Sequence, residues 1–135
     1  MIAVDASAAL AWSHKDERTE AVRAISARVA KEGAVVPALW PIEIANGLTM
    51  AVRRERISVA ERDELLSNFR RLAIEIEAPS MDITWTSTVW LAHRCGLTAY
   101  DAAYLELARR RNLPLATLDE QLADAARAEG VTVLP

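Results

Sequence analysis

The sequence is poor in features that define several classes of protein. Its single cysteine, Cys95, can form no internal disulfide, and its place in an apolar helical segment predicts a small buried side chain without chemistry. No apolar run approaches the roughly 20 residues that span a bilayer. The N-terminus also lacks the positive charge and cleavage site of a signal peptide. These absences predict a cytoplasmic protein without a membrane anchor.

Positive charge is scarce as well. The net charge is −3, which argues against nucleic-acid binding through overall electrostatics and leaves room only for local contacts. Lysine is nearly absent, so most cations are arginines, clustered at 53–56, 70–71 and 109–111. The planar guanidinium suits phosphate better than an ammonium does. Each cluster, taken alone, fits a solvated helix face at least as well.

What the chain does contain indicates one α/β domain spanning residues 1–135. Its 135 residues, 52% of them hydrophobic, suffice to bury about two thirds of the surface of the unfolded chain. Apolar runs predict strands at 1–4, 34–36, 74–76, 115–117 and 131–133. Helical patterns lie between them, at 6–13, 17–32, 41–54, 59–72, 80–95, 99–111 and 120–129. Strands separated by helices predict a parallel sheet with right-handed crossovers, whereas 41–54 and 59–72 form a helical hairpin.

Four acidic residues stand near the starts of the connections between these elements. Asp5 follows the first strand and Asp119 the fourth, at the sheet edge where α/β proteins bind ligands. Glu43 lies in the first turn of the helix after the second strand. Each has a purely structural alternative, helix capping or a favourable dipole contact, and Asp101 in particular fits a capping box with Thr98.

Convergence of these acids would require a cation. Two carboxylates about 4 Å apart repel by about 4 kcal/mol at an effective dielectric of 20, which a bound cation or raised pKa values would offset. Hard oxygen ligands without a histidine or thiolate cluster favour Mg²⁺ or Mn²⁺ over zinc.

Four segments together resemble the PIN-domain ribonucleases, specifically the VapC-type toxins of toxin-antitoxin pairs. They read VDAS at 4–7, EIAN at 43–46, LTAYDAAYL at 97–105 and TLDEQL at 117–122, so the resemblance covers nearly the whole chain. It implies a three-layer fold in which helices flank a five-stranded parallel sheet of order 3-2-1-4-5. It also implies Mg²⁺- or Mn²⁺-dependent endonucleolytic cleavage of RNA, which we expect to be single-stranded or looped.

The resemblance also assigns roles to individual residues. Asp5, Glu43, Asp101 and Asp119 match the catalytic acids. Among them, Asp5 and Asp101 would bind the metal, and Glu43 and Asp119 would bind it directly or through water. Supporting positions are Ser7, Thr117 and Asn46, and the candidates for holding substrate phosphates are Arg53, Arg54 and Arg94. Some members carry a further acid after the last motif, which leaves the roles of Glu120 and Asp124 open.

The resemblance further implies partners. A small antitoxin would restrain the enzyme by placing an arginine among the acids and docking apolar residues on the 41–72 hairpin, with Trp40 and Phe69 as anchors. We also expect a homodimer.

Two other functions compete with the nuclease. A receiver-like phosphoacceptor domain needs an adjacent acid pair and a lysine near the last strand, whereas the only lysines of this sequence are Lys15 and Lys31. A catalytically silent PIN-fold binding module stays open, because the fold survives loss of its metal site.

The remaining polar and aromatic residues predict structure rather than chemistry. His14 is expected at the surface and His93 partly buried. The tryptophans suit core or interface positions. Tyr100 and Tyr104, four residues apart on one helix, are expected to pack at a helix or dimer interface rather than take part in cleavage.

Overall fold

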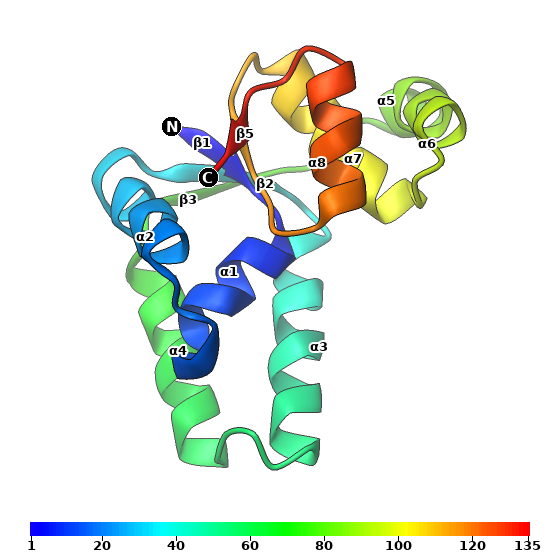
Figure 1. The fold of residues 1–135 in the computed structure, drawn as a ribbon. Coiled ribbons are helices and arrows are strands. Elements are labelled where there is room, and N and C mark those ends of the chain that lie inside the picture. Colours follow the sequence, from blue (N-terminus) through cyan, green and yellow to red (C-terminus); the bar gives the residue numbers. More distant parts are fainter.

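A computed structural model describes residues 1–135 and contains one parallel sheet flanked by helices (Figure 1). The strands are β1 Ile2–Val4, β2 Ala34–Pro37, β3 Ile74–Glu77, β4 Leu115–Ala116 and β5 Val133–Leu134. The helices are α1 Ala6–Ser13, α2 Glu20–Glu32, α3 Trp40–Arg53, α4 Val59–Arg71, α5 Met81–Ile83, α6 Val89–Cys95, α7 Ala99–Arg110 and α8 Glu120–Ala128. A 3₁₀ turn at Lys15–Glu17 and a π-helical turn at Thr84–Thr88 complete the list.

The sheet has the order β3-β2-β1-β4-β5 with every pair parallel, which confirms the predicted fold. From β1 the chain first builds outward to β2 and β3, and then crosses back to add β4 on the other side. The order of the strands therefore reverses between β1 and β4. In open α/β sheets the crevice beyond the carboxyl ends of the strands at such a point is the usual ligand site.

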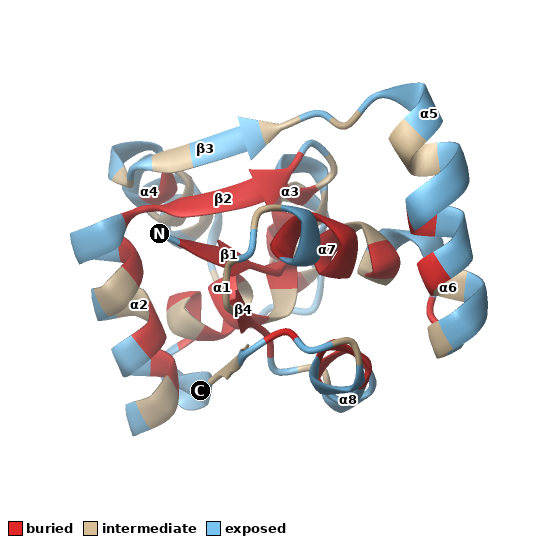
Figure 2. Cartoon of the chain, turned by 90° about the horizontal axis from the view of Figure 1, so that it is seen from above, coloured by how far each residue is buried: buried red, intermediate tan, exposed pale blue.

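The central strands are apolar because helices cover both of their faces. In the view of Figure 1, α1 to α4 extend below the strands, whereas α5 to α8 gather beside and above them. Strands β1, β2 and β4 are buried throughout, and Figure 2 shows them in red at the centre of the molecule. Strand β3 alternates Ile and Glu and is half exposed, as predicted for an edge strand.

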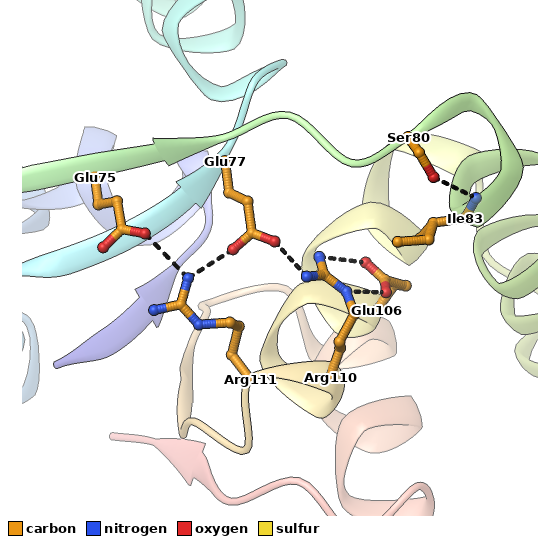
Figure 3. A network of polar contacts seen from close by, with 7 residues as sticks. All are labelled: Glu75, Glu77, Ser80, Ile83, Glu106, Arg110 and Arg111. Carbon is orange, nitrogen blue, oxygen red and sulfur yellow. Dashed lines mark hydrogen bonds and ion pairs between the residues drawn. The ribbon is translucent and has the colours of Figure 1, made fainter.

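An ion-pair network ties the edge strand β3 to the end of helix α7 (Figure 3). Arg110 pairs with Glu77 on β3 and with Glu106 one turn earlier on α7. Arg111 contacts Glu77 at 2.7 Å and Glu75 at 3.0 Å. The network holds in place the helix whose first turns carry Asp101.

Helices α3 and α4 form the predicted antiparallel hairpin. The capping box that starts α4 is present in full, with Ser58 and Glu61 each accepting from the other's backbone N–H. At the sheet end of the hairpin, Trp40 and Phe69 are both buried and their ring centroids lie 5.6 Å apart in a T-shaped arrangement. Their prediction as surface anchors for a partner was therefore wrong, because the core already uses both rings.

Several boundaries differ from the sequence prediction for local reasons. Helix α2 begins three residues late, because the Thr19 side chain caps it by accepting from the Val22 N–H. The last strand shifts to Val133–Leu134, the residues that pair with β4. The helix predicted at 80–95 contains the π-helical turn. None of the helices combines the length and the apolar character needed to span a bilayer.

Some side chains lie elsewhere than predicted. His14 is buried and His93 is exposed, the reverse of the expectation. Cys95 is only partly buried. The tryptophans were predicted at core or interface positions; Trp40 is in the core, whereas Trp85 and Trp90 are exposed, which leaves only the interface alternative for these two.

Candidate active site

Asp5 lies at the carboxyl end of β1 and is almost fully enclosed, with 4% of its surface exposed. Its carboxylate caps α1 by accepting from the Ala8 N–H at 2.9 Å. The Ser7 hydroxyl donates to both carboxylate oxygens, at 2.7 and 2.9 Å, and the Thr117 hydroxyl donates to Oδ2 at 2.5 Å. Asp5 is thus a helix cap. Its carboxylate is also held by two hydroxyls, one after β1 and one after β4, and capping α1 does not require these two bonds.

The same two hydroxyls join the loops that follow β1 and β4. Ser7 Oγ accepts from the Leu118 N–H at 3.2 Å, and Thr117 Oγ1 accepts from the Asp119 N–H at 3.0 Å. Asp119 in turn caps α8, accepting from the Leu122 N–H at 2.9 Å. These bonds link Asp5 and Asp119 through Thr117, at the point where the strand order reverses.

Glu43 and Asp101 come from two different helices, α3 and α7. Glu43 is partly buried, and the Tyr104 hydroxyl donates to its Oε2 at 2.5 Å. For Asp101, the Thr98 side chain accepts from its backbone N–H at 3.2 Å, which is half of the predicted capping box. The Thr98 hydroxyl also acts on the Asp101 carboxylate and lowers its pKa, so the capping residue accounts for part of the surroundings of this carboxylate.

The pKa values of three of these acids show that they influence one another. Burial raises the pKa of Asp5, and the charge of Asp101 adds to this, while hydrogen bonds from Thr117, Ala8 and Ser7 oppose it. Burial likewise raises the pKa of Glu43 and of Asp101. The charges of Asp101 and Asp5 raise the pKa of Glu43 further, and the charge of Asp119 raises the pKa of Asp101 further. No arginine or lysine forms an ion pair with any of the four.

The donor set suits a hard divalent cation, because it consists of carboxylate oxygens supported by hydroxyls. The acids are neighbours but do not form a finished coordination sphere. No three histidine, cysteine, aspartate or glutamate side chains are arranged closely enough to hold an ion as they stand. Asp5 is held by three donors, whereas Asp101 is only partly buried.

A groove of about 810 Å³ leads away from the acids between α1 and α3. Ser7, Asn46 and Asp119 line it near the acids, and Arg54 and Arg56 line it farther along. Arg56 already pairs with Asp16 and Glu17, whereas Arg54 forms no ion pair. The groove therefore includes one of the three arginines predicted to hold phosphates.

The other two predicted arginines do not line this groove. Arg53 is exposed on α3 without contributing to it. Arg94 pairs with Glu129 at 2.8 Å and lies over the Trp90 ring, 5.0 Å from its centroid. Glu120 and Asp124, the two acids of α8 whose roles were left open, do not point to a role either. Asp124 pairs with Arg127 at 3.2 Å, and Glu120 is exposed.

Tyr104 is the residue of this site that the sequence analysis missed. It was expected to pack, and it does so with 1% of its surface exposed, but its hydroxyl also reaches Glu43 on another helix. A signal was present in the sequence. Tyr104 lies three residues after Asp101 on one helix, and residues at this spacing share a face.

A parallel sheet that gathers acids where its strand order reverses defines a class of α/β domains with a polar ligand site at that edge. The chain belongs to the PIN domain family, whose model matches residues 2–128.

Curated relatives place it near the VapC ribonucleases. Ribonuclease VapC9 of Mycobacterium tuberculosis is 37% identical over 136 residues, covering 100% of this chain and 99% of the relative. Ribonuclease VapC3 of Pyrobaculum aerophilum is 35% identical over 124 residues, covering 91% and 92%.

Solved structures share the fold. PAE2754 from Pyrobaculum aerophilum superposes with a TM-score of 0.69 at 23% identity, over 98% of this chain and 82% of that one. VapC20 of Mycobacterium tuberculosis, described as a toxin that cleaves the sarcin-ricin loop, gives a TM-score of 0.67 at 16% identity, over 93% and 95%. FitAcB from Neisseria gonorrhoeae gives 0.66 at 18% identity, over 100% and 97%.

Proposed function

We propose that the protein is a toxin endoribonuclease that cleaves single-stranded or looped RNA with the help of Mg²⁺ or Mn²⁺. The observation that carries this proposal is Asp5, a buried carboxylate held by three donors, with Asp101 and Glu43 within electrostatic range and no cation of the protein to offset these charges. Membership of the PIN family and full-length similarity to VapC ribonucleases support it. We expect the enzyme to act in the cytoplasm, where such RNA is found.

Asp5 and Asp101 would hold the cation, and Glu43 and Asp119 would contact it directly or through water. A bound divalent cation supplies a water of lowered pKa and stabilises charge on the scissile phosphate. The residues of the chain have complementary tasks. Ser7 and Thr117 keep the Asp5 carboxylate turned toward the crevice, while the partly buried carboxylate of Asp101 can adjust to the ion.

The groove between α1 and α3 is the proposed path of the RNA strand. It begins beside Asp119 and Ser7 and includes Arg54, whose guanidinium is not neutralised by an acid and can bind a flanking phosphate. Replacing Arg54 with alanine should weaken RNA binding by an inactive Asp5→Asn protein, as measured by fluorescence anisotropy. Unchanged affinity would contradict this path.

An antitoxin is the proposed protein partner. An arginine from it could take the place of the missing cation, because a guanidinium forms charge-assisted hydrogen bonds with carboxylates. The apolar contacts of the antitoxin must use surfaces other than Trp40 and Phe69, which are buried.

A homodimer is proposed from an apolar stripe on the α5–α6 segment. Met81, Trp85 and Val89 follow one another at intervals of four residues and are all exposed, Trp85 by 69% of its surface. Exposed apolar side chains in a row often mark an interface. Light scattering of the purified protein tests this pairing, and a monomer at micromolar concentration would contradict it.

Expression in cells tests the proposed activity. Induction of the wild type should arrest growth and produce new RNA 5′ ends at defined positions. An adjacent small gene should relieve the arrest. Asp5→Asn, expressed to the same level, should produce neither effect, whereas Asp63→Asn, an exposed acid on α4, should behave as the wild type. Harmless expression of soluble wild-type protein that creates no new 5′ ends would favour a silent binding module instead.

A further inference from the structure

Tyr104 connects the hydrophobic core to the acidic centre. It extends from α7 and is buried with 1% of its surface exposed, and its hydroxyl donates to Glu43 Oε2 on α3 at 2.5 Å. No other side chain or backbone group of the protein donates a hydrogen bond to this carboxylate. The other oxygen of Glu43 therefore has no protein partner.

Glu43 depends on this contact for its orientation. It lies in the first turn of α3, where an acid can fold back to cap its own helix, but α3 has no side-chain capping bond. Nor does Glu43 form an ion pair with any arginine or lysine. Without the phenol, the side chain would be held only by the packing of its methylene groups.

The electrostatics of the contact agree with this role. Burial raises the pKa of Glu43 and the Tyr104 hydrogen bond lowers it, opposing the added effect of Asp101 and Asp5. Burial and the neighbouring Glu43 also raise the pKa of Tyr104 itself, so the phenol stays protonated as a donor. The backbone N–H of Ala6, the residue after Asp5, also acts on the phenol oxygen. Tyr104 thus lies between the chain at Asp5 and the Glu43 carboxylate.

Packing alone does not explain the hydroxyl. A phenylalanine would fill the same space in the core without bringing a polar group that has to be satisfied there. We propose that Tyr104 is a positioning residue of the metal site, which holds one oxygen of Glu43 and leaves the other for the cation or for a water bound to it. This inference rests on the proposed metal-dependent function. Groups that orient metal-binding carboxylates commonly change metal affinity or activity by about 10- to 100-fold.

The test compares Tyr104→Phe with Tyr100→Phe, one turn away on the same helix, whose side chain is exposed and makes no contact with the acids. Calorimetric titration with Mn²⁺, without RNA, should give a Kd about 10- to 100-fold higher for Tyr104→Phe than for the wild type. Tyr100→Phe should bind as the wild type does. With RNA, Tyr104→Phe should lower kcat at saturating metal and leave KM for RNA nearly unchanged.

A second pair of variants separates positioning from general damage to the fold. In a Glu43→Gln background, adding Tyr104→Phe should cause no further loss of Mn²⁺ affinity, because the phenol acts through Glu43. The inference would be overturned if Tyr104→Phe bound Mn²⁺ as tightly as the wild type does. It would also be overturned if Tyr104→Phe lowered the Mn²⁺ affinity of Glu43→Gln as much as it lowers that of the wild type. Either result would leave the proposed function intact. A wild type that binds no Mn²⁺ would overturn both.

Discussion

Asp5 serves two purposes at the scale of a single residue. Its carboxylate caps α1 through the Ala8 N–H, as the sequence alone suggests for an acid after a strand. The tertiary structure then adds Ser7 and Thr117 as donors and brings Asp101 within electrostatic range. The capping pattern and the functional pattern therefore do not exclude each other, and local sequence cannot decide between them.

The raised pKa of Asp5 predicts how stability depends on pH without metal. Because folding raises the pKa above its ordinary value of 3.8, the folded state favours the neutral acid. Its contribution to stability is therefore fully present below pH 3.8 and is lost as the pH rises through the higher folded-state pKa. In EDTA, the stability of Asp5→Asn relative to the wild type should therefore rise as the pH is raised from about 4 to 7, by about 1 kcal/mol or more.

Urea unfolding at several pH values measures this difference between the two proteins. Asp63→Asn is the matched control, because its exposed carboxylate pairs only with Arg62 on the surface. A stability difference between Asp5→Asn and the wild type that stays constant over this pH range would contradict the burial argument. Saturating Mn²⁺ should reverse the order, because it stabilises the protein that binds it.

At the scale of elements, the contact between α7 and β3 holds the helix that carries Asp101 and Tyr104. Glu106 is 5% exposed at its side chain and Arg110 is 32% exposed. Removing Arg110 leaves the Glu106 carboxylate buried without its partner. Losing one partner of a buried pair typically costs about 3 to 5 kcal/mol. Because water reaches Arg110, we expect Arg110→Ala to lower the free energy of unfolding by about 1 to 3 kcal/mol.

Urea unfolding in the presence of EDTA checks this value without a contribution from metal. Arg62→Ala, which removes a surface pair with Asp63, is the comparison and should change stability by no more than about 0.5 kcal/mol. Equal losses in the two variants would show that the network contributes no more than an exposed ion pair.

The elements also show which parts of the fold the sequence could predict. The alternation of apolar runs and helical patterns was enough to predict the parallel sheet and the α3–α4 hairpin with its capping box. The order of the strands was predicted from the family resemblance. The last strand was misplaced because pairing with β4, not local propensity, selects Val133–Leu134. The π-helical turn at Thr84–Thr88 has no local signal that we recognise.

The same distinction holds for the site. The positions of the four acids at strand ends and helix starts could be predicted from the chain order, whereas their role as metal ligands stays a prediction. Tyr104 could not be assigned to Glu43, because the two are 61 residues apart and their contact depends on how α7 and α3 are placed relative to the sheet. The pairing of Arg94 with Glu129 could not be predicted either, since it depends on contacts between distant segments.

At the scale of the whole molecule, the charge distribution links metal and substrate. The protein carries a net charge of −3, and its acids gather at the end of the groove proposed for RNA. Without a cation, this end repels the phosphate that has to be cleaved. We therefore propose that a divalent ion must first reverse the local charge before cleavage, and this metal dependence is the central claim.

Cleavage of a defined single-stranded RNA by the purified, partner-free protein tests this claim most directly. The assay compares Mg²⁺ or Mn²⁺ with EDTA, and wild type with Asp101→Asn and the control Asp63→Asn. We predict that EDTA and Asp101→Asn each lower the cleavage rate by about 100-fold or more, because an amide ligates hard cations poorly, and that Asp63→Asn leaves the rate unchanged. Undiminished cleavage in EDTA, or full activity of Asp101→Asn, would contradict the account.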